Sequence, residues 1–88
     1  MNDTISEIKQ RLAVLAPEHL EIVDESALHA GHAGARSGGG HYQLTLISAV
    51  FTGQTSVARH RVIYQALGDL MANRIHALSI TALAPGEL

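Results

Sequence analysis

The fold is decided by a stretch in the second half of the chain, Arg59-His60-Arg61-Val62-Ile63-Tyr64 through Ile75-His76-Ala77-Leu78. This stretch predicts a helix with a basic, histidine-bearing start, which leads into a strand that opens on a second histidine. Thr55 or Ser56 can cap the start of the helix, and Asn73 suits its end. The helix has one apolar face, which predicts packing against a core and consists of Ile63, Ala66, Leu67, Leu70 and Met71.

An amphipathic helix of about three turns is predicted near the start of the sequence. Thr4 and Glu7 have the spacing of a capping box, in which two side chains bond to free backbone N–H groups. Pro17 disfavours a helical conformation before it, so we expect this helix to stop near Leu15 or Ala16. Its apolar residues recur at helical spacing and are Ile5, Ile8, Leu12 and Leu15.

Three strands are predicted, over residues 19–25, 41–51 and 75–83. The first two begin with alternating apolar and polar residues. The end of the second strand is continuously apolar, which predicts that this end is covered on both faces. Residues 26–40 are rich in glycine, alanine and histidine, and we expect them to form a long loop between the first two strands.

The order of the elements is helix, strand, strand, helix, strand. A strand–helix–strand crossover makes its two strands parallel, whereas two strands joined by a loop alone are expected to be antiparallel. The sequence therefore predicts an α+β sandwich, in which a three-stranded mixed sheet carries two helices on one face. Its 88 residues are expected to form a single domain, residues 1–88.

The composition argues against several classes of protein. The chain has no cysteine, which fits a reducing compartment and leaves no thiolate ligand or cysteine nucleophile. No apolar run is long enough to cross a bilayer, so we expect a cytoplasmic protein with no membrane partner. No catalytic triad, phosphate-binding glycine loop or pair of carboxylates stands out, and an enzyme is not expected.

The predicted sheet brings together histidines that lie far apart in the sequence. Parallel pairing places the start of the third strand beside the start of the second, next to the loop that carries His29 and His32. His76 would then lie near that loop, and two histidines on one open edge could ligate a metal. A structural interpretation is the alternative: His76 shares strand parity with Leu78 and Ile80, which points it toward the helix-covered face as a partly buried histidine.

A second candidate surface is the basic start of the later helix, Arg59, His60 and Arg61. The net charge of −2 argues against a general nucleic-acid binder. The charge is uneven, however, because acidic residues dominate the first part of the chain and arginines the later part. This asymmetry indicates a partner surface there, with an ordinary solvated helix face as the alternative.

Together these residues resemble the BolA family. The matching pieces follow one another along nearly the whole chain, and the ordered set is specific although each piece alone is weak. The resemblance implies a KH-like (class II-like) α-β-β-α-β fold, in agreement with the order of elements above. The pieces are Leu20-Glu21-Ile22-Val23-Asp24-Glu25-Ser26, His41-Tyr42, Phe51-Thr52-Gly53, Arg59-His60-Arg61 followed by Tyr64, and Ile75-His76-Ala77-Leu78-Ser79-Ile80.

The resemblance also implies a partner and a cargo. BolA-like proteins pair with monothiol glutaredoxins and share a 2Fe–2S cluster, for which the glutaredoxin supplies a cysteine and a bound glutathione. His76 matches the ligand histidine of the family, and a second ligand comes from the loop, where this cysteine-free chain resembles the histidine type. His29 takes that position when counted from Glu25-Ser26, and His32 fits better when counted back from His41-Tyr42.

Alone, the protein is expected to hold no cluster stably, since it offers at most two convergent histidines and a 2Fe–2S cluster usually needs four ligands. We expect a monomer or a weak homodimer. BolA-like proteins are also described as DNA-binding transcriptional regulators of stress response and cell morphology, an alternative that Arg59 and Arg61 support. A plain interaction domain with structural histidines is the third interpretation.

Overall fold

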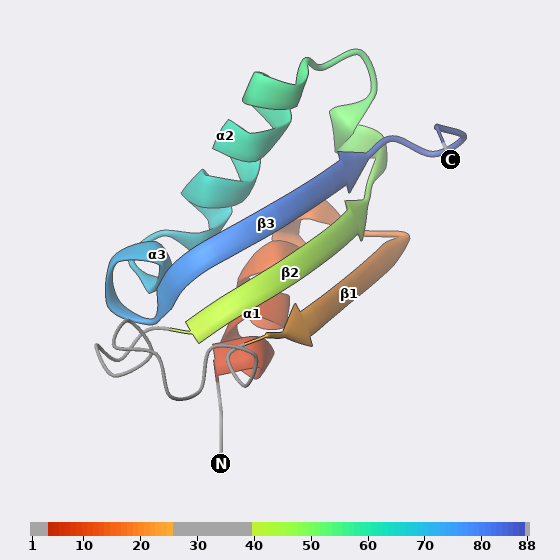
Figure 1. Ribbon diagram of the computed structural model, residues 1–88. Helices are drawn as coiled ribbons and strands as arrows, with labels where there is room; N and C mark the ends of the chain where they lie inside the picture. The colour runs from red at the N-terminus through yellow and green to blue at the C-terminus, as the bar shows by residue number, and fades with distance from the viewer. Residues whose placement is uncertain (1–3, 26–39, 88) are drawn as a thin grey trace.

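The computed structural model describes residues 4–25 and 40–87, which form a layer of helices against a sheet (Figure 1). Most of the predicted long loop, with His29 and His32, lies outside the described residues. In chain order the elements are α1 (Thr4–Leu12), the 3₁₀ helix η1 (Ala13–Leu15), β1 (His19–Asp24), β2 (Gly40–Ile47), the 3₁₀ helix η4 (Ala49–Phe51), α2 (Ser56–Leu67), α3 (Leu70–Asn73) and β3 (Ile75–Leu83).

The sheet has the predicted topology. Its strand order is β1-β2-β3, with β1 antiparallel and β3 parallel to the central β2. Both α1 and α2 lie against the same face of the sheet, and none of the described elements covers the other face (Figure 1). The predicted α+β architecture, with a three-stranded mixed sheet and helices on one face, is therefore confirmed.

The core lies between the helices and the sheet, and it is mainly aliphatic. The apolar faces predicted for the two long helices supply one side of it. The other side comes from alternate residues of β2, because successive side chains of a strand point to opposite faces. The buried apolar residues are Ile8, Leu12, Leu15, Tyr42, Leu44, Leu46, Phe51, Ile63, Leu67, Leu70, Ile75 and Ala84.

The central strand is shorter than predicted, because it ends at Ile47 instead of Phe51. Ser48 ends it: the hydroxyl donates a hydrogen bond to the carbonyl of Leu15 (2.6 Å) and accepts one from the N–H of Val50 (3.2 Å), which caps η4. This turn buries Phe51 completely and leaves Val50 exposed. The apolar run that predicted a strand covered on both faces is a capped helical turn.

The helix predicted to run as far as Asn73 is two helices. Thr55 caps α2 as expected, since its hydroxyl accepts a hydrogen bond from the N–H of Ala58 at 3.1 Å. The helix ends at Leu67, because Gly68 follows with a φ of 57°, a left-handed value that glycine adopts readily. The predicted apolar stripe nevertheless continues onto α3, so the break does not interrupt the core.

Candidate metal centre

Strand β3 begins with an irregularity in its pairing with β2. Gly40 pairs with Ile75, but the next residue, His41, pairs with Ala77, which leaves His76 as an extra residue. Such a β-bulge interrupts the alternation of side chains between the two faces of a sheet. Ile75 belongs to the core, whereas both His76 and Ala77 are exposed.

The prediction that His76 points toward the helix-covered face as a partly buried residue is wrong. That prediction assumed that side chains alternate between the two faces without interruption from His76 to Leu78, and the bulge interrupts this alternation. The exposed His76 ring instead stacks on the ring of His41, with the centroids 4.9 Å apart and the planes inclined by 29°. His41 alternates with the buried Tyr42 and Leu44, which places it on the uncovered face of the sheet.

His41 was not among the predicted site residues, although the sequence carried a signal for it. The parallel pairing that placed His76 at the edge also places the start of the central strand there, and His41 stands at that start. The alternation of residues 41–46 further indicates that His41 faces away from the core. The predicted topology therefore places His41 at the same edge as His76.

The two described residues that flank positions 26–39, Glu25 and Gly40, are both hydrogen-bonded at this edge. On one side, the N–H of Glu25 donates a hydrogen bond to the carbonyl of His41 at 2.7 Å. On the other side, the N–H of Gly40 donates to the carbonyl of Arg74 at 3.1 Å. Glu25 and Gly40, the described residues that flank His29 and His32 in the sequence, are thus both bonded to the chain beside the stacked rings.

A complete metal site does not exist within residues 4–25 and 40–87. These residues contain no group of three or more histidine, aspartate or glutamate side chains placed to hold a metal ion. The donor type at the edge is nevertheless suitable, since imidazole nitrogen ligates iron both in mononuclear sites and in Rieske clusters. The edge can supply part of a coordination sphere if other groups complete it.

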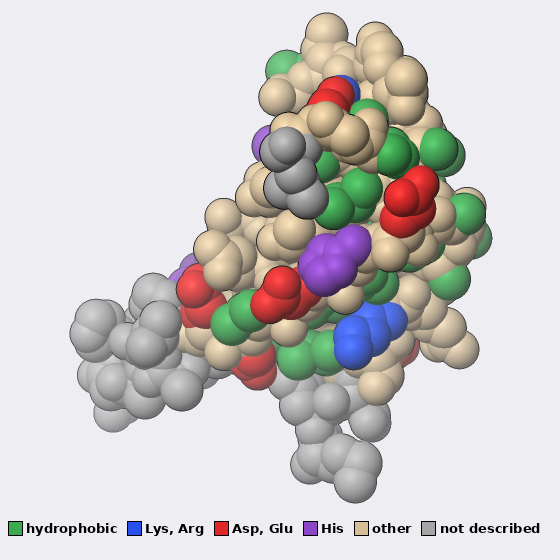
Figure 2. All heavy atoms as spheres, turned by 90° about the vertical axis from the view of Figure 1, so that its right-hand side faces the viewer, with side chains coloured by type: hydrophobic (Ala, Val, Ile, Leu, Met, Phe, Trp, Pro, Cys, Tyr) green, Lys and Arg blue, Asp and Glu red, His purple; other side chains and the backbone are tan. Residues whose placement is uncertain are grey.

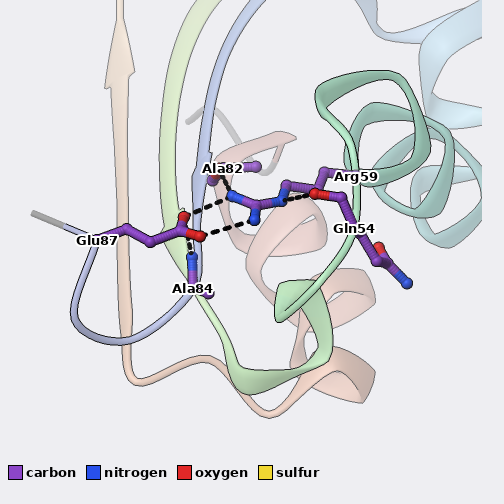
Figure 3. Close-up of polar contacts among 5 residues, drawn as sticks. All are labelled: Gln54, Arg59, Ala82, Ala84 and Glu87. Atoms are coloured by element: carbon purple, nitrogen blue, oxygen red, sulfur yellow. Dashed lines mark hydrogen bonds and ion pairs between the residues drawn. The ribbon is translucent and has the colours of Figure 1, made fainter.

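Arg59, at the start of α2, is held by polar groups of the same chain (Figure 3). Its Nε donates to the carbonyl of Gln54 (2.9 Å), and its Nη1 donates to the carbonyl of Ala82 (3.0 Å). Glu87 accepts from both terminal nitrogens, at 2.6 and 2.9 Å. We call these four residues the C-terminal clamp. The Arg59 side chain is only 12% exposed, so its guanidinium is not free to meet a phosphate.

The carboxylate of Glu87 has a strongly lowered pKa. The hydrogen bonds from Arg59 and from the N–H of Ala84 (2.8 Å) lower this pKa from the usual 4.5 to about 2. The same contact raises the pKa of Arg59. Both members of the pair are therefore charged at neutral pH, and the clamp is closed there.

The predicted basic surface is left with two accessible members. His60 is half-buried and Arg61 is exposed, and within the described part of the chain Arg61 has no ion-pair partner. The side of the molecule seen in Figure 2 mixes acidic, apolar and histidine side chains and shows no concentration of basic ones. An extended basic surface, the footprint of a general nucleic-acid binder, is not visible on that side.

The described residues thus form a small α+β domain, in which an uncovered sheet edge presents two histidines. The model of the family described as "BolA-like protein" matches residues 12–87. The chain belongs to the BolA family.

Three comparisons give the extent of the similarity. SufE-like protein 1 of Arabidopsis thaliana is 43% identical over 79 residues, which are 84% of this chain and 21% of that protein. The DNA-binding transcriptional regulator BolA of Vibrio cholerae is 44% identical over 64 residues, 73% of this chain and 58% of the other. The solved BolA domain of SufE1 from Arabidopsis thaliana is similar with a TM-score of 0.85 and 38% identity, over 100% of this chain and 99% of that one.

The chain thus spans about a fifth of the first of these relatives and a little over half of the second. Within residues 4–25 and 40–87, every helix is too short or too polar to cross a membrane. SufE-like protein 1 is named as chloroplastic/mitochondrial, so relatives are not confined to one compartment. A cytoplasmic location of this chain stays a prediction.

Proposed function

We propose that this protein is an adaptor that pairs with a monothiol glutaredoxin and shares a 2Fe–2S cluster with it during iron–sulfur cluster assembly and trafficking. The observation that carries the proposal is the exposed His76 ring, stacked on His41 at the uncovered edge of the sheet. Glu25 and Gly40, which flank His29 and His32 in the sequence, are hydrogen-bonded at the same edge. This placement of the flanking residues supports a loop histidine as the second ligand.

The ligands of the cluster would be divided between the two proteins. This chain offers His76 and one loop histidine, His29 or His32, and the glutaredoxin offers a cysteine and its bound glutathione. A 2Fe–2S cluster usually needs four ligands, so this chain with its two histidines does not hold the cluster stably alone. Replacing thiolates by histidines raises the potential of a cluster, as it does in Rieske centres. The cluster is then a cargo that this chain holds only while it is in contact with the glutaredoxin.

The proposal is tested by mixing the protein with cluster-loaded monothiol glutaredoxin. We expect a one-to-one complex on gel filtration and a changed visible circular dichroism spectrum. His76→Ala should abolish that change while the free energy of unfolding stays within about 0.5 kcal/mol, because the side chain is exposed. His19→Ala is the matched control, since His19 is an exposed histidine at the other end of the sheet, paired with Ile47. A His76→Ala complex with the wild-type spectrum and cluster lifetime would reject the proposal.

The two loop histidines are separated by single and double variants. His29→Ala and His32→Ala should each weaken the complex less than His76→Ala, because a neighbouring histidine can replace the lost one. The double variant should match His76→Ala in cluster lifetime. A double variant that behaves like the wild-type protein would remove the loop from the ligand set.

DNA binding is a second candidate, favoured by the names of two relatives. Those of Vibrio cholerae and Escherichia coli are both called DNA-binding transcriptional regulator BolA. In this chain the accessible cation of the basic surface is Arg61, whereas Arg59 is held in the C-terminal clamp. Arg61→Ala should then reduce the slope of log DNA affinity against log salt concentration by about one unit, measured by fluorescence anisotropy. An unchanged slope would exclude this surface.

A further inference from the structure

We propose that His41 is a positioning residue, which holds the His76 ring in its binding orientation and does not itself ligate the metal. This inference rests on the function proposed above. The two rings stack across the bulge between β2 and β3, with centroids 4.9 Å apart and planes inclined by 29°. The bulge is what brings His76 over His41, since an unbroken β3 would send residue 76 to the other face.

The stacked arrangement does not suit ligation of one metal by both rings. An imidazole binds a metal through a nitrogen lone pair in the plane of its ring, over a bond of about 2.0–2.1 Å for zinc. Two planes inclined by only 29°, with centroids 4.9 Å apart, converge well beyond that bond length. One ring would have to leave the stack before both could reach one ion. The observed geometry therefore fits one ring as the metal ligand and the other ring as a support that holds it in place.

His41 is the fixed member of the pair and His76 the accessible one. The backbone of His41 lies within the pairing of β2, and its carbonyl accepts the N–H of Glu25 at 2.7 Å. The His41 residue is half-buried, whereas His76 is exposed at the bulge. A flat ring packed against His76 restricts its rotamers before any metal arrives. The entropy lost in ordering the ligand is then lost on folding and not on complex formation.

The first experiment uses the protein alone and needs no glutaredoxin. Side-chain couplings of His76, measured by NMR, should report one dominant rotamer in the wild-type protein. His41→Ala should give rotamer averaging at His76, and His41→Phe should restore the single rotamer, because phenylalanine keeps the flat ring and removes both nitrogens. Urea unfolding would check that each variant is folded. A His76 side chain that is equally ordered in His41→Ala would overturn the proposal.

The second experiment places the same variants in the complex with cluster-loaded glutaredoxin. His41→Ala should shorten the cluster lifetime about tenfold, the effect typical of residues that orient a ligand. His41→Phe should restore most of the lifetime, with the nitrogen couplings of the reduced cluster unchanged in pulsed EPR. If His41→Phe instead loses the cluster as His76→Ala does, or loses a nitrogen coupling, His41 is a ligand and the proposal is wrong. If even the wild-type protein takes up no cluster, the proposed function fails, and the rotamer measurement still decides whether His41 orders His76.

Discussion

The two ends of β3 lie beside basic side chains in opposite situations: His76 is part of the first end, and Arg59 of α2 contacts the last. At the first end, His76 lies exposed on a β-bulge, where its ring stacks on the ring of His41. At the other end, the carbonyl of Ala82 and the carboxylate of Glu87, which lies beyond the strand, accept hydrogen bonds from the guanidinium of Arg59. Both residues looked like binding groups in the sequence. The difference teaches that a charged or ligating side chain is available for a partner only where the chain's own backbone and carboxylates leave it unused.

Phe51→Ala should cause the largest loss of stability, and it should act near the end of β3 that contacts Arg59. Phe51 is fully buried, and the Arg59 guanidinium lies 6.0 Å from the centre of its ring. Removing a buried phenylalanine side chain costs about 3–5 kcal/mol of unfolding free energy. Urea unfolding would measure this loss. Val50→Ala is the control, because Val50 is the preceding residue but is exposed, and its loss should be within about 0.5 kcal/mol. Equal losses in the two variants would contradict the assignment of Phe51 to the core.

Gly40→Ala should cause an intermediate loss of stability, and it should act near the end of β3 that carries His76. A Cβ atom at Gly40 would overlap the ring of Tyr42, which is only 4% exposed and therefore cannot move freely. Overpacking of this kind costs about 1–3 kcal/mol. The cost should largely disappear in a Tyr42→Ala background, where the ring is absent. A double-mutant cycle in urea measures the coupling, and a coupling near zero would show that the ring does not oppose the new atom.

Glu87→Gln should have the smallest effect, and its size should depend on pH. The folded protein lowers the pKa of Glu87 from 4.5 to about 2, so the charged carboxylate stabilises the fold above pH 4.5. This stabilisation is lost as the pH falls from 4.5 toward 2. The difference in melting temperature between wild type and Glu87→Gln should therefore shrink over that interval.

Because Arg59 is the main cause of the lowered pKa of Glu87, Arg59→Met provides the matched background. In that background the pH dependence of the Glu87→Gln difference should be much weaker. Added salt should reduce the wild-type difference as well, because the carboxylate is partly exposed. A melting-temperature difference that is constant from pH 5 to pH 2 would show that the pair is not linked to folding.

Much of the fold could be predicted from local patterns. Helical spacing identified the face of α1 that buries Ile8 and Leu12, and alternation identified the core side of β2. The third strand was predicted with its observed limits, and the crossover rule supplied its parallel pairing. These features depend on neighbours in the sequence or on a general rule of chirality, so the sequence alone suffices for them.

The features that local sequence patterns did not predict depend on single residues or on partners that are distant in the sequence. Ser48 and Gly68 each end an element whose apolar pattern continues past it. The bulge at His76 follows from the pairing register of two strands, which no periodicity in β3 reveals. The partner of Arg59 is Glu87, and nothing in either residue's local sequence indicates the contact. The choice between His29 and His32 lies outside the described residues.

The hydrogen bond from Glu25 to His41 has a consequence for how this family can diverge. The described pairing of β1 with β2 ends at Asp24 and Tyr42, and the bond from Glu25 to His41 lies directly beyond that pair. Lengthening a flexible connection costs only about 0.6 kcal/mol for each doubling of its length. Changes of sequence between Glu25 and Gly40 should therefore leave the observed pairing of β1 with β2 in place. For the proposed function, this means that the ligand expected from this segment could be exchanged while β1 and β2 keep their pairing.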